Sequence, residues 1–245
     1  ISLMNKNDEL HLNIFDKLGL SEFTYKTFAS GGIFSKYSHE FQVISDAGED
    51  TIYIDEKRKI AINKEVLTDD VLVDLGLNKD DLKEKKSIEI GNIFKLGTKF
   101  SEPLELFYTD QEGKKKPVIM GSYGIGPGRV MGTIVESLSD DKGIVWPKSV
   151  SPFDVHLVTI GQDVSVKNFA DDLYAKLRHS SVDVLYDDRD LRAGEKFADS
   201  DLIGIPLRCV ISEKTLSEDR VEIKYRNNDQ VELISKDEFL KRVIL

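Results

Sequence analysis

The stretch that decides the fold is Met120-Gly121-Ser122-Tyr123-Gly124-Ile125-Gly126-Pro127-Gly128-Arg129. Four glycines lie between an expected strand at 118–120 and a helix with Val130, Ile134 and Leu138 at helical spacing. Glycine lets the backbone approach a ligand closely, and the first turn of a helix offers free N–H groups to an anion. Arg129 adds a planar donor fork suited to phosphate. The stretch therefore predicts either a nucleotide phosphate site or a glycine turn that serves close packing alone.

A dinucleotide site is a second interpretation of the same glycines. Gly124, Gly126 and Gly128 loosely resemble the fingerprint of dinucleotide-binding oxidoreductases. The spacing differs, however, and no acidic residue ends a following strand at the expected distance. The flanking strands also do not provide the strand order that such a fold needs, so this interpretation is disfavoured.

On the amino-terminal side of this stretch, the pattern predicts a helix and then several strands. Asp8 is expected to cap the helix and Gly19 to end it, with an inner face formed by Leu10, Ile14, Phe15 and Leu18. The expected strands are residues 23–28, 41–45, 51–54, 60–63, 88–96 and 104–108, with a polar surface excursion at 68–86. Strands followed by one long helix predict an antiparallel sheet with helices packed on it.

On the carboxy-terminal side, the pattern changes after a linker at 143–152 that contains Pro147 and Pro152. Apolar strands are expected at 155–160, 182–186, 207–211 and 221–225, and helices at 166–177 and 197–203. A capping box of Ser235 and Glu238 is expected to open a last helix. Alternating strands and helices predict an α/β layer with parallel pairing. The whole chain is therefore expected to be α+β, with domains at 1–148 and 149–245.

Composition limits the function classes. The formal net charge of −10 argues against the broad cationic surface that non-specific nucleic-acid binding requires. No apolar run is long enough to span a bilayer, and the first twenty residues lack the pattern of a signal peptide, so we expect a cytoplasmic protein without a membrane partner. The single cysteine, Cys209, excludes an internal disulfide and a multi-cysteine metal site, and its apolar neighbours predict a buried thiol.

Two further polar stretches are candidates for a site. Ser38-His39-Glu40-Phe41 suggests hydrolase chemistry, but neighbouring residues on a strand alternate faces and cannot form a triad among themselves. The stretch more plausibly shapes a substrate pocket or satisfies local hydrogen bonds. Residues 187–199 follow a strand and lead into a helix, where α/β sheets place ligands. Their paired aspartates suggest a metal, whereas the interleaved Arg189, Arg192 and Lys196 favour a mixed polar surface able to contact bases, or a solvated loop.

Taken together, these stretches resemble the bacterial-type prolyl-tRNA synthetases, which are class II enzymes. Each motif alone is weak, but the ordered set covers nearly the whole chain. The matching stretches are residues 31–41, 48–50, 91–101, 120–129, 143–147, 151–153, 187–199 and 202–206.

The resemblance implies ATP-dependent activation of proline and its transfer to tRNA-Pro, with Mg2+ arriving through ATP and a homodimer expected for the full-length enzyme. Residues 120–136 would be motif 3, and Arg129 would be its catalytic residue, holding the ATP triphosphate. The implied ATP-binding residues are Arg129, Gly126, Gly124 and Asn92. The implied proline pocket comprises Phe94, Ser122, Gly124, His39 and Glu40. The domain at 1–148 would be the carboxy-terminal part of the catalytic domain. That at 149–245 would be an α/β anticodon-binding domain with a mixed sheet, contacting tRNA through Asp187, Asp188, Arg189 and Lys196.

Departures from the family pattern shape the remaining expectations. Motifs 1 and 2 would precede Ile1, so we expect a carboxy-terminal portion that does not form prolyl-adenylate alone. Only residues 64–89 stand where the family has its editing insertion, so we do not expect editing by this chain itself. Ser122 replaces a common cysteine, Ala193 replaces a common proline, and Pro127 removes one N–H donor from the anion site. The alternative hypothesis is a synthetase-derived accessory module that binds RNA or a partner without catalysis.

Overall fold

The computed structural model describes residues 2–244 and divides into two compact units, Ile1–Ser137 and Leu138–Leu245. The division falls before the expected boundary at 148/149, because the intervening segment bonds to the second unit. The N–H of Ile144 donates to the carbonyl of Leu202 at 3.2 Å, and that of Trp146 to the carbonyl of Gly204 at 3.3 Å. The expected linker is thus a hydrogen-bonded part of the second unit.

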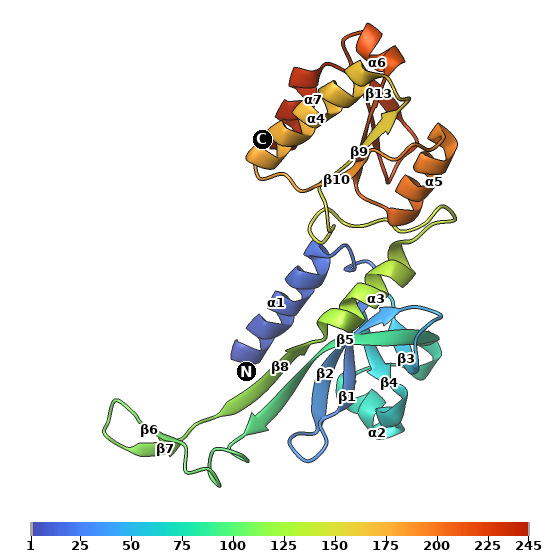
Figure 1. Cartoon of the computed structure of the whole chain (residues 1–245). Helices are drawn as coiled ribbons and strands as arrows, with labels where there is room; N and C mark the ends of the chain where they lie inside the picture. Colours follow the sequence, from blue (N-terminus) through green and yellow to red (C-terminus); the bar gives the residue numbers. More distant parts are fainter. Residues whose placement is uncertain (1, 245) are drawn as a thin grey trace. The chain divides into compact units, whose positions relative to one another are not determined.

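The first unit is built on a six-stranded sheet of β1 (Thr24–Ser30), β2 (Tyr37–Ile44), β3 (Asp50–Asp55), β4 (Ile60–Asn63), β5 (Lys83–Gly97) and β8 (Met120–Ile125). The strand order is β2-β1-β4-β3-β5-β8, and β2 also pairs with β5. Five strands therefore close into a ring, and β8 lies outside it (Figure 1). The pairings are antiparallel except for β1 with β4. This sheet confirms the predicted antiparallel architecture.

Strand β5 makes this closure possible because its fifteen residues serve two sets of neighbours. Its first part pairs with β3, with Asp50 opposite Ser87, and its later part pairs with β2 and β8. The expected strand at 88–96 is therefore longer at its start. The excursion before it contains a short helix, α2 (Asp69–Leu75), which begins at the capping hydroxyl of Thr68 and ends at Gly76 with φ 62°.

Helix α1 (Ser2–Lys17) differs from the expectation in its start and its buried face. Asp8 lies inside the helix and accepts a hydrogen bond from Lys26 at 2.5 Å. Among residues 6–17 of this helix, the buried side chains are Asp8, His11 and Phe15, whereas Leu10 and Ile14 are exposed. Apolar spacing misidentified the face, because the polar Asp8 and His11 face the sheet: the His11 ring stacks on Phe41 of β2 at 4.9 Å.

The glycine-rich stretch is mostly strand, which corrects the expectation of a turn. Residues Met120–Ile125 form β8, and helix α3 (Pro127–Leu138) begins two residues later. None of the four glycines has a positive φ; Gly121 and Gly124 instead lie where a Cβ atom would collide, with the Tyr123 hydroxyl at 2.5 Å and the Asn92 Oδ1 at 2.9 Å. A side chain added at either position would have to displace Tyr123 or Asn92, whereas the backbone conformation itself does not require glycine. Pro127 occupies the first helical position, where its missing N–H breaks no helical hydrogen bond.

A two-stranded arm connects β5 to β8. It carries β6 (Phe107–Thr109) and β7 (Lys115–Pro117), which pair with each other and project from the sheet in Figure 1. The expected strand at 104–108 is thus shorter and shifted. Several apolar side chains of the arm are exposed: Phe100, Leu104, Leu106, Tyr108 and Ile119.

The second unit contains a five-stranded sheet in the order β10-β9-β11-β12-β13. Its strands are β9 (Val155–Ile160), β10 (Val184–Asp187), β11 (Leu207–Ser212), β12 (Val221–Tyr225) and β13 (Val231–Ile234). The first three pair in parallel and the rest antiparallel, which confirms the predicted mixed sheet. The helices are α4 (Val164–His179), α5 (Ala193–Ile203), α6 (Glu213–Ser217) and α7 (Lys236–Ile244). The sequence did not predict α6 or β13.

The two faces of this sheet are packed differently. The apolar core lies on the side of α4 and α7, and it includes Leu173, Phe239 and the buried thiol of Cys209, as predicted. Figure 1 shows α5 on the other face, where Lys196 and Ser200 are its buried side chains. Helix α5 is therefore attached mainly through polar contacts. No helix among residues 2–244 is long and apolar enough to cross a membrane.

Candidate functional site

Three strands bring the predicted residues of the first unit together. In the pairing of β2, β5 and β8, Glu40 lies opposite Asn92, and Asn92 lies opposite Gly124. Phe94 and Ser122 are paired two residues farther along the same strands. Because side chains two residues apart share a face, these five residues lie on one side of the sheet.

A β-bulge adds Glu89 to this face. The register passes from Phe41 opposite Gly91 to Gln42 opposite Glu89, so Ile90 is an extra residue in β5. An extra residue reverses the alternation of side chains, and Glu89 therefore faces the same side as Asn92, three positions later. The Asn92 amide donates to the Glu89 carboxylate at 2.8 Å.

Arg129 completes this group from the first turn of α3. Its Nη1 donates to the backbone carbonyl of Glu89 at 2.8 Å and to the Glu89 carboxylate at 3.0 Å. The arginine side chain is 56% exposed, so it remains accessible to a ligand in spite of these two contacts. Two contacts through one nitrogen fix its direction and leave its surface accessible to an anionic ligand.

Two hollows meet at Glu89 and Arg129. One, of about 400 Å³, is lined by Asn92, Gly124, Gly126 and Arg129 among others, which are the four predicted ATP-binding residues. The other, of about 460 Å³, is lined by Glu49, Asp50, Ser87, Glu89 and Arg129 among others. Arg129 is thus the cation of the site. Carboxylates line the hollow on one side of it, and glycines line the hollow on the other side.

Glu40 is held in a partly buried polar network on the same face. It accepts hydrogen bonds from Gln42 at 2.9 Å and from Asn63 at 3.2 Å, and Gln42 also donates to Asp50 at 2.8 Å. Burial raises the pKa of Glu40, and the nearby Glu89 and Asp50 add to the rise, although the two hydrogen bonds oppose it. The Glu40 carboxyl therefore takes up a proton more readily than an exposed glutamate, and pairing with a cationic ligand would stabilise its charged form.

His39 lies apart from the other residues predicted for the proline pocket. It faces α1, and its Nδ1 contacts the Asp8 carboxylate at 2.9 Å. Its ring meets Phe28 edge-on at 5.3 Å. The structure thus separates His39 from Glu40, Phe94, Ser122 and Gly124, and gives it a place in fastening α1 to the sheet.

The predicted contact residues of the second unit cluster at the carboxyl end of β10. Asp187 accepts from Arg189 Nε at 2.9 Å and Nη2 at 2.8 Å, and Arg189 also donates to Asp199 at 2.7 Å. Lys196 donates to the carbonyls of Thr159 at 2.8 Å and Asp187 at 3.1 Å. The hydrogen bonds from Arg189 lower the pKa of Asp187 to about 2, so this carboxylate stays charged at neutral pH.

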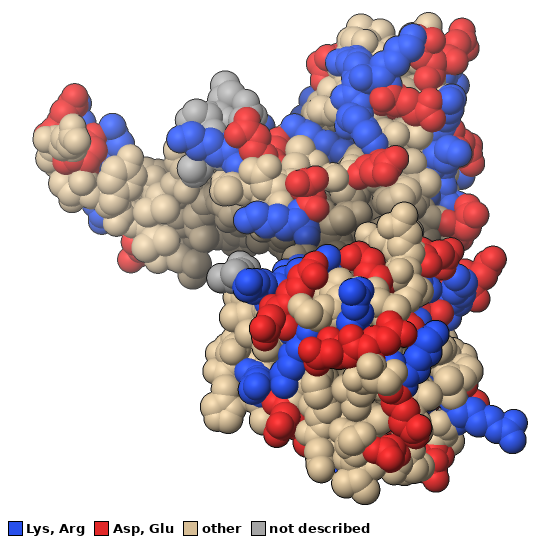
Figure 2. Space-filling model, turned by 90° about the horizontal axis from the view of Figure 1, so that it is seen from above, with Lys and Arg blue, Asp and Glu red and all other residues tan. Residues whose placement is uncertain are grey.

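These four residues differ in accessibility. Asp187 and Lys196 are buried, and their polar atoms bond within the protein, whereas Asp188 and Arg189 are exposed. Only the latter two present side chains to a ligand. Figure 2 shows lysine and arginine interspersed with aspartate and glutamate over the visible face, consistent with local contacts rather than a broad basic surface.

We expect His156 of β9 to make the stability of this unit sensitive to mild acid. It is 1% exposed, and burial lowers its pKa from 6.5 to about 4. The unfolded chain takes up this proton below about pH 6.5 and the folded chain only below about 4, so stability falls as pH drops through that window. The loss should reach ~3 kcal/mol. Urea unfolding followed by the single tryptophan should show it between pH 7 and 4.5.

The control for this prediction is the exposed His179 of α4. His156→Gln should remove the pH dependence in this window, whereas His179→Gln should retain it. An unchanged slope in His156→Gln would show that other groups cause the loss.

Glu89 is the main site residue that sequence reasoning missed, together with Gln42, Asp50 and Asn63 around Glu40. Regular alternation would place Glu89 on the opposite face from Asn92, and no sequence signal marks the bulge. Asp199 was also missed as a partner of Arg189, although its helical position in α5 follows that loop closely. Within residues 2–244, no group of three or more histidine, cysteine, aspartate or glutamate side chains is arranged to hold a metal ion.

Family models match both units. The model described as "tRNA synthetase class II core domain (G, H, P, S and T)" matches residues 3–138. The model described as "Anticodon binding domain" matches residues 154–244. The first match covers more than half of the chain and contains the whole group around Arg129; the second contains the cluster around Asp187.

Individual proteins agree with these matches. A proline–tRNA ligase of Thermodesulfovibrio yellowstonii is 46% identical over 175 residues, which cover 67% of this chain and 30% of the relative. A proline–tRNA ligase of a Wolbachia species is 36% identical over 239 residues, covering 93% and 56%. The chain thus spans about half or less of the length of these relatives. The Giardia lamblia prolyl-tRNA synthetase in complex with prolyl-adenylate shares the fold, with a TM-score of 0.60, 18% identity and coverage of 86% of this chain and 36% of that one.

Proposed function

We propose that the chain is the carboxy-terminal portion of a proline–tRNA ligase. It belongs to the class II tRNA synthetases, and its relatives confirm its resemblance to the prolyl-tRNA synthetases. Residues 1–148 would belong to the catalytic domain and residues 149–245 to the tRNA-recognising part. The observation that carries the proposal is the placement of Arg129, fixed by Glu89 and open to the hollow formed with Asn92 and Gly124.

ATP is the ligand proposed for this hollow. Arg129 would hold the triphosphate, since its fork is exposed and directed by Glu89. Gly124 and Gly126 would let the nucleotide lie close to the backbone, and Asn92 would contact it through its amide. Pro127 leaves the helix start with one N–H donor fewer, so the arginine rather than the helix end supplies most of the attraction.

Proline would lie on the same sheet face, near Glu40, Phe94, Ser122 and Gly124. The partly buried Glu40 is suited to a cationic imino group, because pairing with a cation relieves the cost of its burial. Phe94 offers an apolar surface for the ring. His39 is left out of this pocket, because it faces α1.

The reaction needs electrostatics and positioning rather than a protein nucleophile. An oxygen of the proline carboxylate would form a bond to the α-phosphorus of ATP, while the bond from that phosphorus to the bridging oxygen breaks and pyrophosphate leaves. The hydroxyl at the 3′ end of tRNA-Pro would then attack the adenylate carbonyl and release AMP. Arg129 would stabilise the negative charge on the leaving pyrophosphate.

Mg2+ would enter with the nucleotide. Magnesium commonly binds through one or two carboxylates together with substrate phosphates. No group of three or more acidic, histidine or cysteine side chains among residues 2–244 is arranged to hold a metal, so the ligands of the ion would come mainly from the phosphates and water, with Glu89 as a carboxylate at the edge of the hollow. The charge of the ion would offset that of the phosphates.

A binding experiment tests the tRNA part of the proposal on the chain as it stands. The purified chain should bind tRNA-Pro about tenfold or more tightly than the same tRNA with a changed anticodon, at a fixed salt concentration. Equal affinities would overturn the proposed anticodon recognition. Arg189→Ala should reduce the preference, whereas Arg178→Ala, on an exposed arginine of α4 paired with Asp183, should leave it unchanged.

An accessory module without catalysis is the competing function. It would bind RNA or a partner but would not need the fixed geometry of Arg129, Glu89 and Asn92. That geometry favours the ligase. The complete ligase is proposed to act as a homodimer in the cytoplasm, where tRNA is charged for protein synthesis.

A further inference from the structure

The carboxy-terminal end of α5 is capped by a segment from elsewhere in the chain. A helix leaves its last carbonyls without helical partners, and here four successive ones, at residues 201–204, are all satisfied. Trp146 donates through its indole to Ile203 at 3.0 Å and through its backbone to Gly204, and Ile144 donates to Leu202. The fourth, Asp201, accepts from Arg226 Nε at 2.9 Å. We name residues 139–146, which follow α3 directly in sequence, the strap.

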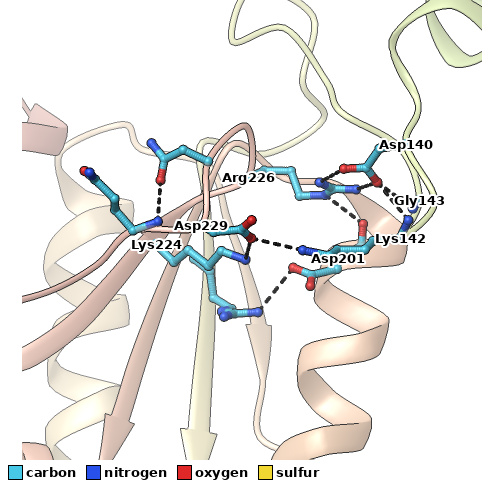
Figure 3. A network of polar contacts seen from close by, with 10 residues as sticks. Asp140, Lys142, Gly143, Asp201, Lys224, Arg226 and Asp229 are labelled. Carbon is cyan, nitrogen blue, oxygen red and sulfur yellow. Dashed lines mark hydrogen bonds and ion pairs between the residues drawn. The ribbon is translucent and has the colours of Figure 1, made fainter.

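Arg226 joins the strap to α5 in one side chain. Its two terminal nitrogens bind the Asp140 carboxylate at 2.7 and 2.5 Å, while its Nε binds α5 (Figure 3). The arginine is 8% exposed, so loss of one partner would leave a buried charge uncompensated. A lysine cannot reproduce these three contacts, because it lacks the planar fork.

Two glycines bring the strap into direct contact with the helix end. A Cβ at Gly143 would lie 2.4 Å from the Cα of Leu202, and one at Gly204 would lie 2.0 Å from the carbonyl oxygen of Ile144. The strap therefore contacts the end of α5 backbone to backbone, with no room for a side chain at either glycine.

The other end of α5 holds the candidate RNA-contact loop, residues 187–192. Lys196 and Asp199 of the helix bind Asp187 and Arg189, as described above. Since α5 has few apolar anchors, both ends are attached by polar contacts, and a rigid helix of eleven residues joins them.

We propose that Arg226 is a positioning residue that couples the RNA-contact loop to the strap through α5. The inference rests on the proposed function, because the ligand of the loop is taken to be tRNA. When RNA binds Asp188 and Arg189, a change in the position of α5 would be transmitted to residues 139–146.

Hydrogen exchange on the whole chain tests the coupling without RNA. In Arg226→Gln, the amides of Ile144 and Trp146 and also those of residues 188–196 should exchange about tenfold faster or more, while α4 and α7 stay unchanged. Arg226→Lys should behave like Arg226→Gln. Faster exchange confined to residues 139–146 would overturn the proposal.

The matched control is Arg242→Gln. Arg242 also binds two carboxylates, those of Glu232 and Glu238, and these partners belong to β13 and α7 rather than to α5. It should leave exchange at 188–196 as in the unmodified chain. If Arg226→Gln fails to fold, Asp140→Asn provides a milder variant, because Asp140 is half exposed, and the same exchange pattern is then expected from it.

Trp146 supplies a second readout, since it is the single tryptophan of the chain. Binding of the anticodon stem-loop of tRNA-Pro, followed by anisotropy of a labelled RNA, should change the Trp146 emission. In Arg226→Gln the RNA should still bind within about threefold, but the emission should no longer respond. Binding without an emission change in the unmodified chain would overturn the coupling. Absence of binding would instead refute the proposed function, and the exchange pattern would still decide the coupling.

Discussion

In the complete ligase proposed above, replacement of Arg129 by alanine is expected to lower proline-dependent ATP–pyrophosphate exchange by about 100- to 1000-fold. The guanidinium is the one cation at the junction of the two hollows, among the described residues that line them. Its charge would act most strongly as pyrophosphate leaves, so turnover should fall more than proline affinity. Exchange of labelled pyrophosphate into ATP measures this directly.

Arg129→Lys should retain only a small part of the exchange activity of the unmodified enzyme. A lysine cannot keep two contacts to Glu89 and also contact the nucleotide. Arg58→Ala is the matched control, since Arg58 is also an exposed arginine of the first unit that donates to carbonyls, those of Leu75 and Gly76. It should keep near-normal exchange. Equal losses in the two alanine variants would mean that Arg129 acts through folding.

Gly204→Ala is expected to destabilise the second unit by about 2–4 kcal/mol, because the substitution combines a left-handed backbone with a collision. Gly204 has φ 80°, and an added Cβ would lie 2.0 Å from the Ile144 carbonyl oxygen. That oxygen belongs to backbone, so it can move only if the strap does. Urea unfolding followed by the emission of Trp146 should show the loss.

Gly194→Ala provides the comparison within the same helix. Nothing lies within 4 Å of an added Cβ there, and Gly194 is in the first turn of α5. Alanine should stabilise the unit by about 0.5–1 kcal/mol, because it reduces the freedom of the unfolded chain. If Gly204→Ala proved as mild as Gly194→Ala, the strap would not be tightly docked.

Helices and strands could be predicted from the sequence where the spacing of their apolar residues matches the side chains that are buried. Strand β9 and helix α4 follow apolar spacing closely, because both face one apolar core. For helix α1 the same reasoning gave the wrong face, because its inner face carries Asp8 and His11. Their partners, Lys26 and Phe41, lie on β1 and β2. Polar contacts between distant elements leave no periodic trace in the sequence.

The candidate site shows the same limit at finer scale. Arg129, Gly124 and Gly126 were identifiable because glycines before a helix and an arginine in its first turn are local signals. Glu89 was not, because its direction depends on one unpaired residue in β5. Nor did sequence reasoning separate the exposed Arg189 from the buried Lys196, since burial in α5 follows from how the helix is docked.

The bulge at Ile90 also constrains how this protein can change in evolution. Loss of a single residue from the middle of β5 would restore regular pairing with β2 and turn Glu89 away from Asn92 and Arg129, without altering either side chain. Natural variants of this strand should therefore differ by substitution but keep the same length between the Glu89 and Asn92 positions. Insertions and deletions should instead accumulate in the turns of the arm, where no pairing register depends on them.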